Sequence, residues 1–396
     1  LTYEDLRKRL GPLVSAVPRA GRHAEAADVW LDALSTEDGA LRAGVDVVRA
    51  AHPGLDRGLA AAAEKSRDEA TSYDGLIRPR PGLDPRRRGA VLSPSRLEAL
   101  GACPRRYFLQ FVLGIQPVRD PEWDPERWLD ALDRGTLLHA VYERTLDAAR
   151  RVGIDPDDVA FEELALRVLG EEIERTLLRR PAPNDAVLEA EAAELEADVR
   201  AFVDMIRRTR PDWEWLELDF GPGKREVTIP LPGGELRLAG RVDRIDRTPD
   251  GGVRVVDYKT GSRTRYRATR PFEGGRRLQH ILYSLAVERL LGRPVEAMEY
   301  HFPTVRGETE RVVYRREAIA DGPAVVELLL EIAASGHFLP TDDPEDCKFC
   351  DFQAVCRART DDYGKTTCPD VAWAKAALQA DAPEYARLRT LREQYA

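Results

Sequence analysis

The residues with the clearest chemical potential lie between positions 240 and 261, a stretch rich in aspartate, arginine and lysine. The pattern predicts two strands joined by a turn at residues 248–252, because Pro-Asp-Gly-Gly is a strong hairpin signal. Asp243 and Asp257 are equally far from Asp250. A hairpin symmetric about that turn would make the two carboxylates cross-strand neighbours, about 5 Å apart.

Asp257 and Lys259 share one strand face, because side chains alternate along a strand. Two carboxylates as close as Asp243 and Asp257 repel each other unless a cation lies between them. Two acids and an ammonium on one face therefore indicate a metal site with a charge-stabilising lysine. The other interpretation is the solvated polar face of an ordinary hairpin, and this stretch alone leaves both open.

A second group of candidate functional residues is the C-x2-C-x5-C cluster of Cys347, Cys350 and Cys356. Three thiols this close together are typical of a bound metal or iron–sulfur cluster. The fourth ligand would be Cys368, favoured by its proximity in the chain, or the distant Cys103. Cysteines with this spacing, and no secretory signal pattern, indicate a reduced compartment, so we expect a cytoplasmic protein.

Further polar candidates lie on predicted helices. His139 falls within a helix predicted over residues 133–151, and a lone helical histidine is most often structural. Gln279 and Tyr283 are four residues apart and share one face of a helix predicted over residues 276–291.

Two candidates carry charge outside the helices. Glu217 could be an extra acid near the metal or an exposed strand residue, and we expect it to be exposed. Residues 262–275 form a basic loop in which arginine is interleaved with Tyr266, a composition that suits a nucleic-acid backbone or a solvated loop. The candidate DNA-binding arginines are Arg263, Arg265, Arg267 and Arg270.

The elements that must position these residues follow a mixed α/β pattern. A capping box at Ser95 and Glu98 predicts the start of a helix there. The predicted strands cover residues 213–220, 226–231, 235–247, 253–259, 295–304 and 310–314. The predicted organisation is a helical segment over 1–72, a linker over 73–90, a main domain over 91–368 with a helical insertion at about 150–210, and a final helix within 369–396.

Composition limits the alternatives. The 396 residues carry a formal net charge of −9 with 43% hydrophobic and 33% charged residues, which indicates a globular protein without a uniformly basic surface. No apolar run is long enough to span a bilayer, so we expect no membrane association. No Gly-x4-Gly-Lys-Ser/Thr loop occurs, so we find no ATP motor. Because Leu1 already lies in a helical pattern, we expect a fragment of a longer polypeptide.

Taken together, the motifs resemble a RecB-like nuclease domain of the AddB type, in the PD-(D/E)XK superfamily. Five motifs occur in order over residues 72–396. They are Ser93-Pro-Ser-Arg-Leu-Glu with Cys103-Pro and Tyr107-Phe108, Gly135-Thr-Leu-Leu-His139, Gly240-Arg-Val-Asp243 with Val256-Asp257-Tyr258-Lys259, Gln279-His-Ile-Leu-Tyr283, and the terminal cysteine cluster. One departure is Arg105 after Cys103-Pro104, where the family commonly has an aromatic residue.

The resemblance implies a mixed central sheet flanked by helices. It implies that His139, Asp243, Asp257 and the Tyr258 carbonyl hold Mg²⁺ or Mn²⁺. The implied catalytic residues are Asp243, Asp257, Lys259, Gln279 and Tyr283. The implied ligands of a structural 4Fe-4S cluster, which would tie the first helix to the C-terminal segment, are Cys103, Cys347, Cys350 and Cys356, with Cys103 now preferred over Cys368.

The activity implied by the resemblance is hydrolysis of phosphodiester bonds in single-stranded DNA near ends, most simply as an exonuclease. Such domains act in double-strand-break processing and recombinational repair, behind a helicase-like region and with a motor subunit. The competing hypotheses are a catalytically silent scaffold of the same fold that binds DNA ends and a purely structural zinc protein.

Overall fold

The computed structural model describes residues 54–64, 69–117, 124–356, 359–360 and 365–395. The chain divides into two compact units, Leu1–Tyr73 and Asp74–Ala396. In the first unit the described helix is α4 (Leu55–Glu64). Most of the helical segment expected over residues 1–72 lies outside the described residues.

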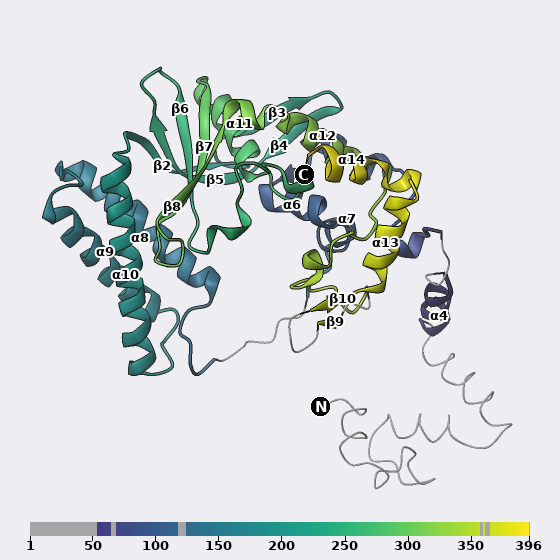
Figure 1. Cartoon of the computed structure of the whole chain (residues 1–396), viewed down its shortest axis with the longest axis horizontal. Coiled ribbons are helices and arrows are strands. Elements are labelled where there is room, and N and C mark those ends of the chain that lie inside the picture. The colour runs from purple at the N-terminus through teal and green to yellow at the C-terminus, as the bar shows by residue number, and fades with distance from the viewer. Residues whose placement is uncertain (1–53, 65–68, 118–123, 357–358, 361–364, 396) are drawn as a thin grey trace, which may run out of the picture. The chain divides into compact units, whose positions relative to one another are not determined.

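A five-stranded sheet forms the centre of the second unit, with the strand order β2-β5-β6-β7-β8 (Figure 1). Strands β6 and β7 are parallel, and their other neighbours are antiparallel. A parallel pair needs a crossover connection, which α11 (Gln279–Leu291) provides. The expected mixed sheet is therefore confirmed. Its strands are β2 (Trp213–Phe220), β5 (Gly240–Arg247), β6 (Val253–Tyr258), β7 (Val295–Phe302) and β8 (Glu310–Arg315).

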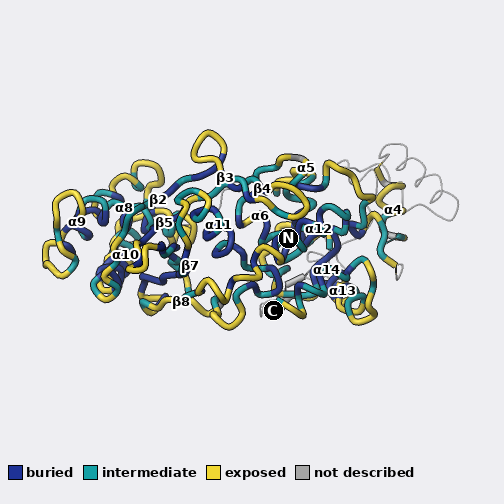
Figure 2. Tube along the Cα trace, turned by 90° about the horizontal axis from the view of Figure 1, so that it is seen from above, coloured by how far each residue is buried: buried dark blue, intermediate teal, exposed yellow. Residues whose placement is uncertain are grey.

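Helices pack on the central sheet from two sides. Val256 and Tyr258 of β6 belong to the apolar core formed with α8 (Ala131–Val152), α9 (Val159–Leu177) and α10 (Asp185–Thr209). Because strand side chains alternate, Asp257 points to the other face, where α11 contacts β6 and β7. Figure 2 shows β7 and α11 as mostly buried, with exposed residues at the connecting loops.

The predicted hairpin between β5 and β6 is confirmed. Arg244 pairs with Val256 and Arg247 with Val253, and the Gly251 amide donates to the Thr248 carbonyl within the turn. The same register places Asp243 opposite Asp257. The Asp243 Oδ2 atom accepts a hydrogen bond from the Tyr258 amide at 2.6 Å.

The single strand expected over residues 235–247 is wrong. It is two strands in different sheets, separated at Ala239. The downstream strand begins at Gly240, where a Cβ atom would lie 2.8 Å from the Phe220 ring and 2.9 Å from the Tyr283 ring. The upstream half, β4, lies in a separate sheet of order β1-β4-β3. Its strands are β1 (Val91–Leu92), β3 (Val227–Leu231) and β4 (Gly234–Leu238).

Outside the central sheet, the expected linker contains a short helix and the expected final helix is interrupted. Residues 74–90, in the expected linker, carry the short helix α5 (Pro85–Arg88), where Arg86 pairs with Asp84 and Glu327. The expected final helix over residues 369–395 is wrong as a single element. It breaks between α13 (Pro369–Gln379) and α14 (Ala386–Gln394), where Asp381 has φ 56° and Pro383 cannot continue a helix.

The remaining helices and short strands lie outside the central sheet. They are α6 (Pro94–Ala102), α7 (Pro104–Tyr107), the π-helical turn η4 (Phe108–Val112), α12 (Gly322–Ser335), α13 (Pro369–Gln379) and α14 (Ala386–Gln394). The two-residue strands β9 (Arg359–Thr360) and β10 (Thr366–Thr367) pair with each other. The short helices are η2 (Ser72–Asp74), η3 (Pro81–Leu83), η5 (Arg263–Arg265), η6 (Glu273–Gly275), η7 (Arg316–Ile319), η8 (Pro344–Cys347) and η9 (Pro383–Tyr385).

The capping box expected at Ser95 and Glu98 is wrong. Helix α6 begins at Pro94, and its N-cap Ser93 makes no side-chain hydrogen bond to the helix backbone. The Glu98 carboxylate instead accepts hydrogen bonds from the amides of Leu278 and Gln279, at the start of α11.

Among the described helices, none combines the length and the apolar character needed to cross a bilayer.

A glycine at the contact between α6 and η6 leads to a stability prediction. A Cβ atom on Gly101 would lie 1.8 Å from the backbone carbonyl oxygen of Gly275, so Gly101→Ala forces two backbones apart. We expect it to lower the free energy of unfolding by about 1–3 kcal/mol in urea denaturation. The matched control is Gly170→Ala in α9, where a Cβ meets nothing within 4 Å and helix propensity should raise stability by about 0.5–1 kcal/mol. Equal effects of the two substitutions would contradict the close approach.

Candidate functional site

An open cavity of about 650 Å³ lies where the end of β6 meets α8 and the first turn of α11. All the side chains expected to hold the metal or take part in catalysis line it. They are His139, Asp243, Asp257, Lys259, Gln279 and Tyr283, joined by Glu217 and the backbone of Tyr258.

His139 lies directly beside the atoms that would share a metal with it. Its Nε2 atom is 3.1 Å from the Tyr258 carbonyl oxygen, and its Nδ1 atom is 3.4 Å from Asp243 Oδ2. Ligand atoms of His139, Asp243 and Glu217 all lie within 4.8 Å of one another. An imidazole with several oxygen atoms is a donor set that suits Mn²⁺ and Mg²⁺.

The exposed position expected for Glu217 is wrong. Its side chain is 12% exposed and takes part in this cluster of acids. The pairing of Leu216 with Arg244 and of Leu218 with Val242 places Glu217 opposite Asp243. Glu217 also has φ 49°, a left-handed backbone conformation that is strained for glutamate, and strain of this kind is enriched at functional sites.

The electrostatics of the cavity follow from carboxylates crowded together in a buried setting. Burial and the charge of Asp243 raise the pKa of Glu217 to about 7. Burial also raises the pKa of Asp257 to about 6, although the nearby Lys259 ammonium opposes the shift. Burial alone would lower the pKa of His139, but Asp243, Asp257 and Glu217 outweigh it and raise this pKa to about 9. The cavity therefore has a strong preference for positive charge.

Gln279 connects the lysine to the second aspartate. Its Nε2 atom donates to Asp257 Oδ1 at 2.7 Å, and its Oε1 atom accepts from Lys259 Nζ at 2.8 Å. Lys259 also forms an ion pair with Asp257 Oδ2 at 2.5 Å. A carboxylate oxygen has more than one lone pair, so Oδ2 could accept a cation beside the ammonium.

Tyr283 is buried beside this group, one helical turn after Gln279. Its ring packs edge-on against Phe220 with the centroids 5.9 Å apart. Burial, together with the nearby Asp257 charge, raises the pKa of Tyr283 to about 12, so its hydroxyl stays protonated.

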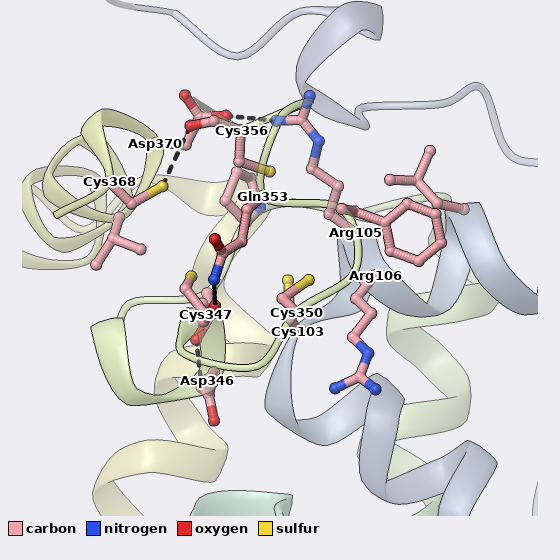
Figure 3. Close-up of a pocket in the computed structure, with 15 residues that line it drawn as sticks. Cys103, Arg105, Arg106, Asp346, Cys347, Cys350, Gln353, Cys356, Cys368 and Asp370 are labelled. Atoms are coloured by element: carbon pink, nitrogen blue, oxygen red, sulfur yellow. Dashed lines mark hydrogen bonds and ion pairs between the residues drawn. The ribbon is translucent and has the colours of Figure 1, made fainter. Parts of the chain in front are cut away.

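The cysteines gather at a second cavity, separate from the acidic one. Figure 3 shows their sulfur atoms on its walls, where Cys103 comes from the end of α6 and the others from the C-terminal segment. Arg105 closes one side by pairing with Asp370 at 2.8 Å. The five lining cysteines are Cys103, Cys347, Cys350, Cys356 and Cys368.

The sulfur atoms surround this cavity without meeting at one point. In the part of the chain that the structure describes, no three of them lie within 4.8 Å of one another. Cys368 differs from the other four, because a hydrogen bond with Cys347 lowers its pKa to about 6. For Cys103, burial raises the pKa to about 11.

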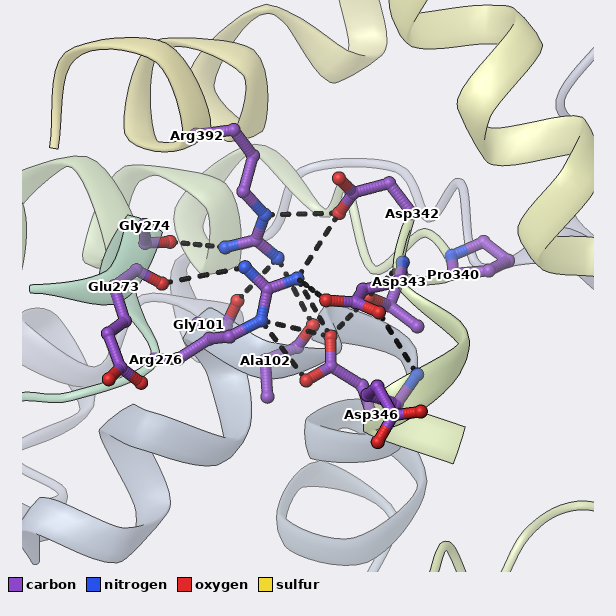
Figure 4. A network of polar contacts seen from close by, with 12 residues as sticks. Gly101, Ala102, Glu273, Gly274, Arg276, Pro340, Asp342, Asp343, Asp346 and Arg392 are labelled. Atoms are coloured by element: carbon purple, nitrogen blue, oxygen red, sulfur yellow. Dashed lines mark hydrogen bonds and ion pairs between the residues drawn. The ribbon is translucent and has the colours of Figure 1, made fainter. Parts of the chain in front are cut away.

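The basic loop forms part of a third cavity, of about 370 Å³, that adjoins the network of Arg276 and Arg392 with acidic side chains drawn in Figure 4. Of the expected DNA-binding arginines, Arg267 and Arg270 line this cavity, whereas Arg263 is exposed and is not among its lining residues. The side chain of Arg265 lies outside the described part.

Comparison with known proteins connects this geometry to a family. The sequence model of the PD-(D/E)XK nuclease superfamily matches residues 91–357. A protein of Desulforudis audaxviator, named as a subunit of an ATP-dependent helicase/deoxyribonuclease, is 33% identical over 204 residues, covering 46% of this chain and 16% of the relative. A protein of the same name from Symbiobacterium thermophilum is 29% identical over 282 residues, covering 60% of this chain and 23% of the relative.

The chain thus spans less than a quarter of the length of these curated relatives. The region matched by the family model contains every residue that lines the acidic cavity. It also contains Cys103, Cys347, Cys350 and Cys356, the last of these close to its end. The chain belongs to the PD-(D/E)XK nuclease superfamily.

Proposed function

We propose that this chain is the nuclease portion of a helicase–nuclease subunit and that it hydrolyses phosphodiester bonds of single-stranded DNA near ends. The observation that carries the proposal is the convergence of His139, Asp243 and Glu217 beside the linked pair Asp257 and Lys259. The names of the relatives support DNA as the substrate and a helicase as part of the same assembly. A role as an exonuclease in double-strand-break repair, with a motor subunit as partner, is part of this proposal.

The residues fit a divalent cation. His139, Asp243, Asp257 and the Tyr258 carbonyl would hold Mg²⁺ or Mn²⁺, with Glu217 as a further acid. The His139 nitrogen atoms already contact the Tyr258 carbonyl oxygen and Asp243 Oδ2, and the buried Asp257 lines the same cavity. Such an ion would supply Lewis-acid polarisation of the scissile phosphate.

Lys259 would contribute a fixed positive charge. Its pKa is raised, because the attraction of Asp257 outweighs burial, so it stays an ammonium at neutral pH. Gln279 holds Nζ toward the cavity, where it would stabilise the charge that develops on the phosphate in the transition state. Tyr283 would help to position the DNA strand or the lysine.

The basic loop would carry the strand away from the acidic cavity. Arg267 and Arg270 face the third cavity, and phosphate contacts from arginine supply sequence-independent affinity. Arg263 and Arg265 would extend this path along the loop. The cavity is local, so it is compatible with the net charge of −9.

The thiol-lined cavity would hold a structural 4Fe-4S cluster through Cys103, Cys347, Cys350 and Cys356. Thiols from the start and the end of the domain reach one cavity, as a covalent closure of a long loop requires.

A silent scaffold that binds DNA ends is the alternative function, and a purely structural zinc protein is the third. The complete set of His139, Asp243, Asp257 and Lys259 in one cavity favours catalysis over both.

Removing the charged groups tests the catalytic proposal. Asp257→Ala and Lys259→Ala should each slow Mg²⁺-dependent cleavage of labelled single-stranded DNA by at least about a hundredfold, because both lie where charge develops. The control is Lys224→Ala, since Lys224 pairs with Asp219 and does not line the cavity. Undiminished cleavage by either variant would remove the assignment, and cleavage unaffected by EDTA would remove the metal.

Metal affinity should depend on pH through His139. A group with a pKa of about 9 is protonated at neutral pH and must lose that proton to bind a cation. Calorimetric titration with Mg²⁺ should therefore show affinity rising by about tenfold per pH unit from pH 7 to 8.5, with proton release. His139→Ala should weaken binding and reduce this slope by about one proton. A slope unchanged by that substitution would show that His139 does not hold the ion.

The cluster proposal predicts iron, colour and a specific set of ligands. Protein purified without oxygen should be brown and contain about four iron atoms. Cys103→Ala and Cys350→Ala should lose colour and iron and unfold more easily, because the closure of the long loop is lost. Cys368→Ala, from the same cavity, should keep both. A colourless protein with one zinc would rule out the cluster.

A further inference from the structure

Glu98 is a half-buried carboxylate on α6 that accepts its hydrogen bonds from the backbone of another helix. A single oxygen, Oε1, accepts hydrogen bonds from the Leu278 amide at 2.8 Å and the Gln279 amide at 3.0 Å. Helix α11 starts there, and its N-cap residue Leu278 offers no side-chain cap. Glu98 therefore satisfies backbone donors at the N-terminus of a helix that begins 181 residues further along the sequence.

The capped residue is the one that organises the acidic cavity. Gln279 donates to Asp257 and accepts from Lys259, so its side-chain amide sets the orientation of both. Because Gln279 is the first residue of α11, its backbone has few intrahelical constraints, and the hydrogen bond to Glu98 supplies one.

The residues around this cap fix α6 against the segment that precedes α11. Gly101 packs on the backbone of Gly275, and Arg392 donates to the carbonyl oxygens of Gly101 and Ala102 (Figure 4). In the same network Arg276 pairs with Asp346 at 2.9 Å. Glu98 is thus held rigidly, on the helix that ends next to Cys103.

We propose that Glu98 is a positioning residue that fixes Gln279 and, through it, Lys259 in the geometry needed for phosphodiester hydrolysis. This inference rests on the proposed function. The link consists of one hydrogen bond from the Gln279 backbone amide to the Glu98 carboxylate and of two that join the Gln279 side chain to Lys259 and Asp257. It acts on the rate of the chemical step, because Glu98 itself lines neither the acidic cavity nor the cavity beside the basic loop.

The first test compares single-turnover cleavage of labelled single-stranded DNA by Glu98→Ala, Glu98→Gln and wild type. Glu98→Ala should slow cleavage at least tenfold and leave the DNA dissociation constant within about twofold. Glu98→Gln should keep the rate within about threefold of wild type, because its amide oxygen can accept the same two hydrogen bonds. Asn184→Ala is the matched control, since Asn184 caps α10 by accepting from the Val187 amide and lies on a helix that contributes no residue to the cavity.

A double substitution separates positioning from general loss of structure. If Glu98 acts through Gln279, then Glu98→Ala combined with Gln279→Ala should be no slower than Gln279→Ala alone. A double variant whose loss of cleavage rate equals the product of the two single losses would overturn the proposal. So would cleavage by Glu98→Ala at the wild-type rate, or a Glu98→Gln variant as slow as Glu98→Ala.

Hydrogen exchange provides a measurement that does not depend on cleavage. The amides of Leu278 and Gln279 should exchange at least tenfold faster in Glu98→Ala than in wild type and Glu98→Gln, while Asn184→Ala leaves them unchanged. If Glu98→Ala does not fold, Glu98→Asp, which is one methylene too short to reach both amides, carries the same expectations for rate and exchange. If the wild type cleaves DNA and Glu98→Ala cleaves it equally fast, this inference alone is overturned. If the wild type does not cleave DNA, the proposed function is overturned and this inference with it.

Discussion

The structure depends on the placement of like charges side by side. The register of the β5–β6 hairpin puts Asp243 opposite Asp257, and the register of β2 brings Glu217 to Asp243. Burial and, to a smaller extent, the repulsion between these carboxylates raise the pKa values of Glu217 and Asp257, so both acids resist ionisation. Without a metal ion, the fold compensates with the Tyr258 amide, a protonated His139 and the Lys259 ammonium.

Each compensating group comes from an element whose position is set by packing elsewhere. Helix α8 carries His139 and is held by the apolar core it forms with α9, α10 and β6. Helix α11 carries Gln279 and forms the crossover between parallel strands, so its first turn must lie near the end of β6. The acidic cavity is therefore built from elements on both faces of one sheet, and Ser262 and Tyr266 of the basic loop also line it.

The local sequence pattern was enough to predict the β5–β6 hairpin and the pairing of the two aspartates across it. The turn signal centred on Asp250 fixed the pairing of Asp243 with Asp257, because register in a hairpin follows from the turn. The four-residue spacing of Gln279 and Tyr283 similarly predicted one helix face, and both residues line the cavity. The helical insertion expected at about 150–210 is also present, as α9 and α10.

What the sequence did not reveal depends on contacts between distant segments. Glu217 joins the site because β2 pairs with β5 across two intervening strands, and no local pattern encodes that register. The need for a glycine at position 240 reflects the rings of Phe220 and Tyr283, which come from elsewhere in the fold. Glu98 matched a local capping box and in fact caps another helix, because the same acid and spacing serve either role.

The most direct measurement of the central claim is anomalous X-ray scattering from crystals grown with Mn²⁺. The proposed site predicts one strong peak within coordination distance of His139, Asp243 and the Tyr258 carbonyl, with Asp257 or Glu217 completing the ligands. A saturated crystal in which Mn²⁺ binds elsewhere, while the His139 ring still contacts Tyr258 and Asp243 directly, would contradict it.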